Sequence, residues 1–155
     1  MDVTKSLNDQ RQRLSIVRDF KAPREVVWRA WTEPDLFSRW YGLDISTLSD
    51  VKMDVRAGGC WRAVMHIPEI PDIAWYAEYR EVAKPEKLVF IMKNPEDQED
   101  TSVETVTVDF EGEAEKTRMI FTQTGYLPPD QYETGLKMGW NAFFDRLDAL
   151  LKEIK

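Results

Sequence analysis

One histidine and one cysteine are the most chemically versatile side chains in this sequence of 155 residues. His66 could serve as a general base, because imidazole exchanges protons near neutral pH. No Ser/His/Asp arrangement is visible in the local sequence, although the members of a triad need not be neighbours in the chain. An exposed or edge histidine is the alternative. Cys60 lies between the cations Arg56 and Arg62, which could activate a thiol, but we expect a partly buried, unreactive one.

The same counts limit the sites that the chain can build. A single histidine excludes a multi-histidine metal site, and a single cysteine excludes a disulfide within the chain. Gly58-Gly59 precedes an expected strand rather than a helix, and it lacks the lysine of a phosphate-binding loop. We therefore predict no metal and no cofactor, and we assign no catalytic residue. Whether the chain catalyses a reaction stays open, with binding favoured.

Aromatic rings are the unusual part of the composition, with six Trp, seven Phe and five Tyr. Rings of this size often only fill a core, and that is the alternative for each of them. A small-molecule pocket is also mainly apolar and aromatic with a few polar groups, and methionine gives it a deformable wall. We predict a ligand-binding set made of Trp31, Trp40, Trp61, Met65, Trp75, Tyr79, Glu81, Phe90, Met92, Met119, Phe121, Gln123, Trp140 and Phe144.

Glu81 and Gln123 are the polar members of this set. Glu81 shares the strand phase of Tyr79 and could reach the end of a cavity, where a carboxylate could orient a ligand. An ion pair at the rim is the alternative for Glu81. Gln123 shares the phase of Met119 and Phe121.

Two periodicities predict the elements that would hold these side chains. Alternation predicts strands over 14–20, 45–55, 60–66, 75–82, 87–92, 103–110 and 116–124. Helical spacing predicts two short helices, opening near Pro23 and Pro34, and a long helix over 129–153. Turns are expected at 57–59, 84–86 and 111–113, and loops at 67–72 and 93–100. We predict an α+β helix-grip fold, in which a curved antiparallel sheet wraps around the long C-terminal helix.

Charge and the chain ends exclude several classes of partner. The net charge of −7 argues against nucleic acid and against an anionic membrane, because both need a basic surface. The start of the chain is polar and resembles no signal peptide, and no stretch approaches 18 apolar residues. We predict a cytoplasmic protein. The acidic segment 93–100 is expected to be an exposed loop, with a docking loop for a basic partner as the alternative.

Six short segments occur in an order that is specific for one fold. They are the strand–helix run 20–34; Trp40-Tyr41-Gly42; Gly58-Gly59-Cys60-Trp61-Arg62 with Met65; the pair Tyr79–Val82 and Pro85–Phe90; Thr117-Arg118-Met119; and Gly139-Trp140. Together they resemble the START-like superfamily, in its branch related to the C-terminal domain of the activator of the ninety-kilodalton heat-shock chaperone ATPase. The resemblance covers about 14–151. Leu43 replaces a frequent proline, and Gln123 replaces a frequent histidine, which weakens any transfer of acid–base chemistry.

The resemblance implies one START-like domain over 1–155 with a polar extension at 1–13, in a branch with many bacterial members. The superfamily includes lipid and hormone binders, polyketide aromatase/cyclases and self-sacrifice antibiotic-resistance proteins. The favoured function is binding of a hydrophobic or aromatic small molecule between the C-terminal helix and the sheet. A cyclase/aromatase-like enzyme, a self-sacrifice resistance protein and a chaperone-activator-like interaction module are the alternatives. A weak homodimer is the expected self-association.

Overall fold

The computed structural model describes residues 12–93 and 104–154. In this part of the chain seven strands form one antiparallel sheet in the order β1-β7-β6-β5-β4-β3-β2. The strands are β1 (Gln12–Phe20), β2 (Thr47–Met53), β3 (Cys60–Ile67), β4 (Ile70–Ala83), β5 (Lys87–Lys93), β6 (Glu104–Glu113) and β7 (Lys116–Gly125). The helical segments are α2 (Arg24–Thr32), α3 (Pro34–Trp40), α4 (Pro129–Gln131), η1 (Tyr132–Leu136) and α5 (Lys137–Ile154).

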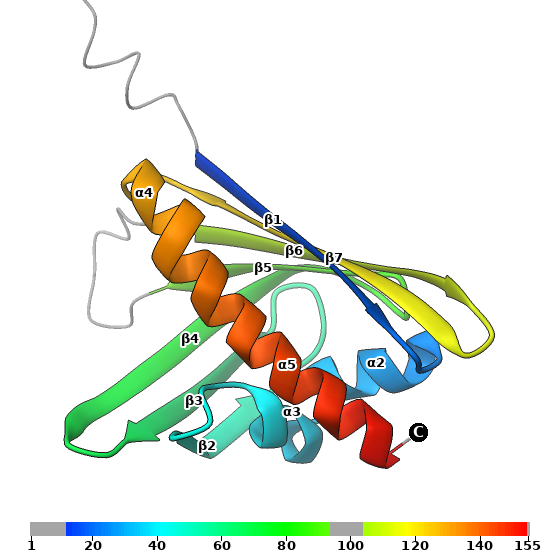
Figure 1. Cartoon of the computed structure of the whole chain (residues 1–155), viewed down its shortest axis with the longest axis horizontal. Helices are drawn as coiled ribbons and strands as arrows, with labels where there is room; N and C mark the ends of the chain where they lie inside the picture. The colour runs from blue at the N-terminus through cyan, green and yellow to red at the C-terminus, as the bar shows by residue number, and fades with distance from the viewer. Residues whose placement is uncertain (1–11, 94–103, 155) are drawn as a thin grey trace, which may run out of the picture.

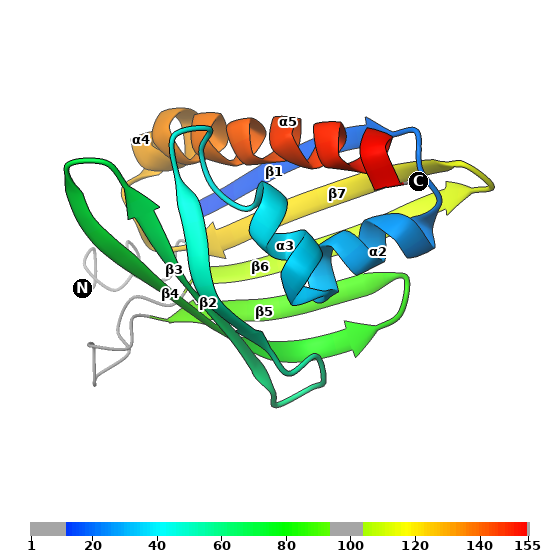
Figure 2. The ribbon, with the colours of Figure 1, turned by 90° about the horizontal axis from the view of Figure 1, so that it is seen from below.

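The sheet curves around the helices and confirms the predicted helix-grip fold (Figures 1 and 2). The strands β2 to β7 follow one another as a meander, and β1 adds to the free edge of β7. Figure 2 shows α5 lying along one side of the curved sheet, with α2 and α3 between sheet and helix near its C-terminal end. The concave face is therefore covered by α2 and α3 at one end and by α5 along its length.

The junction of α2 and α3 depends on a proline and a tryptophan. The carbonyl of Ala30 would normally accept a hydrogen bond from the residue four positions on, which is Pro34 and has no N–H. The Trp40 indole Nε1 donates to this carbonyl instead, at 2.8 Å. Trp40 is fully buried, so the bond satisfies a carbonyl that water does not reach.

One arginine fastens α5 to the end of α3. The Arg146 Nη1 donates to the carbonyl of Leu43 at 2.7 Å, and Nη2 donates to the carbonyl of Arg39 at 3.2 Å. A positive charge at the C-terminal end of a helix is favourable, because the last carbonyls there lack partners within the helix.

Several boundaries differ from the sequence prediction. The loop predicted over 67–72 is a two-residue turn, because β4 begins at Ile70. Pro71 is tolerated in β4 because pairing with β5 begins only at Tyr76, so its missing N–H costs nothing on that side. The turn predicted at 111–113 lies at 114–115 instead, and β6 extends through Glu113.

The long C-terminal helix is confirmed, with a local change near its start. Residues 132–136 form a π-helical segment between α4 and α5. The predicted acidic loop lies almost wholly outside the described residues, as does most of the extension at 1–13.

Candidate ligand-binding site

A pocket of about 240 Å³ opens between the start of α5 and the neighbouring ends of the sheet strands. Strands β4 to β7 supply one wall, and η1 with α5 supply the other. The lining residues are Trp75, Met92, Glu104, Gln123, Gly135, Leu136, Gly139, Trp140 and Phe143. Aromatic and aliphatic groups dominate this lining, and two polar side chains interrupt it.

The polar side chains belong to one hydrogen-bonded network centred on Glu104. Its Oε1 accepts from Gln123 Nε2 at 2.9 Å and from the Tyr132 hydroxyl at 2.8 Å. Its Oε2 accepts from the backbone N–H of Tyr126 at 3.1 Å. Gln123 Oε1 in turn accepts from the Trp140 Nε1 at 2.8 Å. The network ties β6, β7, η1 and α5 together, so the polar end of the pocket is held in place before any ligand arrives.

Glycines open the helical wall of the pocket. Gly139 shares one face of α5 with Trp140 and Phe143, and Leu136 at the end of η1 lies on the same side, because steps of three and four return to the same side of a helix. A Cβ built at Gly139 or at Gly135 meets no atom within 4 Å. Side chains at these two positions would occupy space that is now open.

Two buried donors lie at this end of the core without partners among the described residues. They are the Trp75 Nε1 and the Tyr41 hydroxyl. The Tyr41 ring contacts the rings of Trp75 and Phe143 at centroid distances of 5.3 and 5.0 Å, so it lies directly behind the pocket lining. Burial raises the pKa of Tyr41 well above its ordinary value, which keeps the phenol neutral and able to donate.

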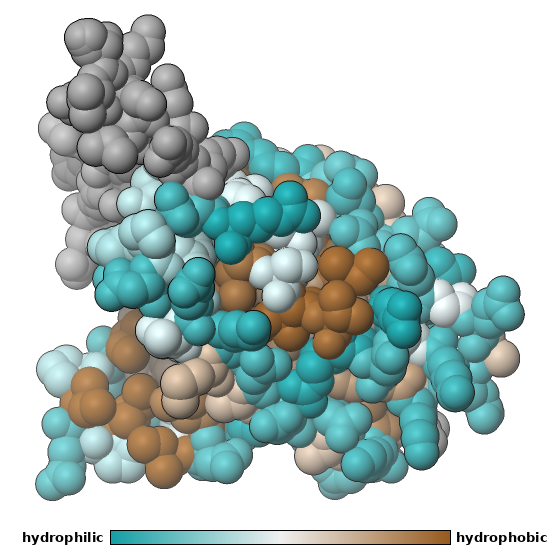
Figure 3. All heavy atoms as spheres, turned by 45° about the horizontal axis from the view of Figure 1, so that its top comes forward, coloured by the Kyte–Doolittle hydropathy of each residue, from teal (hydrophilic) through white to brown (hydrophobic). Residues whose placement is uncertain are grey.

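Apolar side chains continue from the pocket to the surface. Ile73 precedes Trp75 along the same face of β4 and is 37% exposed, and Ile70 at the start of the strand is 52% exposed. Met138, next to Gly139 on α5, is 73% exposed. Figure 3 shows apolar side chains gathered at the tip of the β3–β4 hairpin. A hydrophobic molecule would meet an apolar surface before it reached the pocket.

Thirteen of the fourteen predicted site residues divide into two groups. Trp75, Met92, Gln123 and Trp140 line the pocket. Nine others are at most 2% exposed and pack inside the core, many of them ring against ring, as in the 4.8 Å contact between Trp31 and Trp40. These nine are Trp31, Trp40, Trp61, Met65, Tyr79, Phe90, Met119, Phe121 and Phe144.

Glu81 does not lie on the concave face as its strand phase predicts. The β4–β5 register pairs Tyr79 with Phe90 but Glu81 with Val89, so Arg80 is an extra residue in β4. Such a bulge reverses the alternation beyond it. Glu81 is therefore exposed on the outer face, away from the pocket.

Five lining residues were not in the predicted set: Glu104, Gly135, Leu136, Gly139 and Phe143. Glu104 had a usable signal, because it shares the phase of the buried residues Val106, Val108 and Phe110 and is the charged member of that face. Gly139 had one as well, since it interrupts an otherwise apolar helical stripe. The π-helical segment beside the pocket had no comparable signal.

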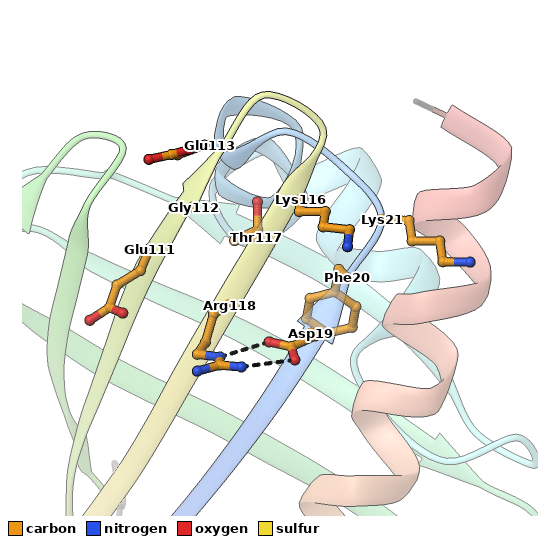
Figure 4. A pocket seen from close by; sticks show the side chains of 9 residues that line it. All are labelled: Asp19, Phe20, Lys21, Glu111, Gly112, Glu113, Lys116, Thr117 and Arg118. Carbon is orange, nitrogen blue, oxygen red and sulfur yellow. Dashed lines mark hydrogen bonds and ion pairs between the residues drawn. The ribbon is translucent and has the colours of Figure 1, made fainter.

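A larger hollow of about 740 Å³ lies near the β6–β7 turn (Figure 4). Its lining carries three acidic and three basic side chains, in Asp19, Glu111, Glu113, Lys21, Lys116 and Arg118. Arg118 donates to both carboxylate oxygens of Asp19, at 2.9 and 3.2 Å, and this contact lowers the pKa of Asp19. The balanced charges and the exposed ion pair of this hollow suit water better than an apolar ligand.

The described part of the chain contains neither a cluster of metal-binding side chains nor a helix that could cross a membrane. No group of three or more His, Cys, Asp or Glu residues within 12–93 and 104–154 could hold a metal ion. No helix in these ranges is long and apolar enough to cross a membrane.

The family described as activator of Hsp90 ATPase homolog 1-like protein matches this sequence over residues 21–152. The chain belongs to this family. The match runs from just before α2 almost to the end of α5, so it includes every element that lines the pocket. No curated protein matches it.

Solved structures similar to this chain come from several bacteria. A protein from Nitrosomonas europaea is 25% identical with a TM-score of 0.77, and the alignment covers 92% of this chain and 95% of that one. An uncharacterised protein from Rhizobium leguminosarum is 26% identical with a TM-score of 0.75, covering 93% and 96%. A protein of unknown function from Staphylococcus aureus, 18% identical with a TM-score of 0.80 and coverage of 93% and 95%, shares the fold. This START-like fold is generally a ligand-binding fold.

Proposed function

We propose that the protein binds a small, flat, hydrophobic molecule in the pocket between α5 and the sheet. The observation that carries the proposal is the open helical wall at Gly139 facing an apolar lining. Well-packed interiors leave few voids larger than a water molecule. A pocket kept open by glycine beside large rings is therefore better suited to a ligand than to core packing.

The size of the pocket sets the size of the ligand. Drug-sized ligands occupy pockets of about 300–1,000 Å³, whereas this one holds about 240 Å³. An engineered apolar cavity of about 150 Å³ takes up benzene. A ligand with one or two fused rings fits between these limits.

The buried polar groups set the chemistry of the ligand. Within the described residues, Trp75 Nε1 is a buried donor without a partner, so a ligand oxygen that reaches it and accepts its hydrogen bond would remove the penalty of leaving it unpaired. Glu104 and Gln123 already satisfy one another, so they add a polar boundary rather than a strong attraction. The ligand is therefore an aromatic molecule with a carbonyl or similar acceptor.

Equilibrium dialysis with two matched probes tests this proposal. 1-Indanone has two fused rings and a carbonyl acceptor, and indane has the same rings without it. One net hydrogen bond of about 0.5–1.5 kcal/mol predicts that 1-indanone binds about two- to tenfold more tightly than indane. In Trp75→Phe this preference should disappear, whereas it should persist in Trp28→Phe, whose ring packs on Phe110 in the core at 5.8 Å. Failure of both probes to bind would overturn the proposal.

A further inference from the structure

A chain of hydrogen bonds joins Ser49, His66 and Asp72 on the outer face of the sheet. The three side chains come from the adjacent strands β2, β3 and β4. Ser49 Oγ lies 2.6 Å from His66 Nε2, and His66 Nδ1 lies 2.9 Å from Asp72 Oδ1. The sequence separations are 17 and 6 residues, so only the strand register brings the three together.

The hydrogen bonds can run in only one direction when the ring is neutral. An ionised carboxylate accepts and does not donate, so Nδ1 of His66 carries the proton that points to Asp72. Nε2 is then the unprotonated nitrogen and accepts from the Ser49 hydroxyl. This is the order of nucleophile, base and orienting carboxylate that recurs on unrelated folds.

The backbone next to Ser49 is irregular. Asp50 has a φ of 53°, and neither Asp50 nor Val51 has a partner in the β2–β3 register. Because β2 is an edge strand, this bulge lies at the border of the sheet. Bulges of this kind occur next to active sites, where they re-aim a side chain.

A groove of about 560 Å³ begins beside the three side chains. Val64 pairs with Ser49 of β2 on one side and with Ala74 of β4 on the other. Val64 and Ala74 line the groove. Lys52 and Arg62 supply two cations in the same lining, against the single carboxylate of Asp50. The groove therefore offers small apolar groups for a substrate to rest on and excess positive charge for an oxygen that gains negative charge.

We propose that Ser49, His66 and Asp72 hydrolyse small carboxylic esters bound in this outer groove. Ser49 Oγ attacks the carbonyl carbon while its proton passes to His66 Nε2. The ester C–O bond then breaks, and the leaving alcohol takes the proton from Nε2. Water attacks the acyl-Ser49 in turn, gives its proton to Nε2, and Ser49 Oγ leaves with that proton as the carboxylic acid is released. Asp72 orients the ring throughout. The site is on the opposite face from the α5 pocket and does not depend on it.

Hydrolysis of 4-nitrophenyl acetate by the full chain tests the proposal. General-base catalysis contributes about 10²–10⁴-fold, so Ser49→Ala and His66→Gln should each lower kcat/KM by about a hundredfold or more. Because the two side chains act as a unit, the double variant should be no worse than either single one. Ser38→Ala is the matched control, because this half-buried serine lies on α3, where its hydroxyl donates to the carbonyl of Asp35 at 2.9 Å.

The single histidine makes the result decisive. Imidazole alone can attack an activated ester, so full activity in Ser49→Ala with loss in His66→Gln would overturn the serine mechanism. Full activity in both variants would assign the hydrolysis to something other than this site, and no activity in the parent protein would overturn the proposal as well. Peptide mass spectrometry of the acylated protein gives an independent readout, because the acetyl group should lie on Ser49 and should be absent from that peptide in His66→Gln.

Discussion

Replacing Gly139 by leucine should fill the pocket and stabilise the fold at the same time. A Cβ at this position meets no atom within 4 Å, and its helix face points to the pocket. Burying a leucine side chain contributes about 1.5–3 kcal/mol. Removing glycine from a helix adds about 0.8 kcal/mol, and ordering the new side chain costs about 0.5–1 kcal/mol. The expected gain in the free energy of unfolding is therefore about 2 kcal/mol.

Thermal unfolding and dialysis of 1-indanone measure the two consequences of Gly139→Leu. The midpoint should rise by about 4–8 °C, since about 1 kcal/mol shifts a domain of this size by roughly 2–4 °C. Affinity for the probe should fall at least tenfold, because the leucine occupies its space. Lys137→Leu, at an exposed position two residues earlier, should leave both quantities nearly unchanged. A destabilised Gly139→Leu that binds the probe normally would show that the pocket reasoning is wrong.

Three further substitutions test the contacts that hold the site. Trp40→Phe should destabilise the fold by about 1 kcal/mol more than Trp31→Phe in urea unfolding. The reason is that Trp40 Nε1 donates to the Ala30 carbonyl, whereas Trp31 Nε1 has no partner among the described residues. Equal losses of stability in the two variants would contradict this. Glu104→Ala should lower the free energy of unfolding by about 2–4 kcal/mol, since three donors lose their acceptor. An unchanged free energy of unfolding would show that the network does not stabilise the fold. Arg146→Met should cost about 1–3 kcal/mol by removing the two hydrogen bonds to the carbonyls of Leu43 and Arg39, and calorimetry that finds no change would refute that role.

Much of the fold could be read from periodicity because the apolar side chains obey it. Trp61, Ala63 and Met65 alternate along β3, and all three are buried, as their phase predicts. The C-terminal stripe behaves in the same way, since Leu147 and Leu150 are buried on one side of α5. In these segments one face is strongly apolar, so a shifted register would expose it to water.

The site was less predictable because it depends on departures from regularity. The bulge at Arg80 moves Glu81 to the outer face, and no residue type in that stretch signals an extra position. The hydrogen bond between Ser49 and His66 likewise depends on the register of two strands. Composition could suggest that rings line a cavity, but only packing shows that rings such as Trp31 close on each other while Trp75 borders open space.

The indole N–H resonances in a ¹H–¹⁵N NMR titration with 1-indanone test the central claim most directly. The Trp75 resonance, assigned with Trp75→Phe, should shift as its N–H gains an acceptor. The Trp140 resonance should move with it, because that side chain also lines the pocket. The resonances of the core residues Trp31, Trp40 and Trp61 should stay in place. A titration that moves the core resonances and leaves Trp75 unchanged would contradict a ligand site beneath the start of α5.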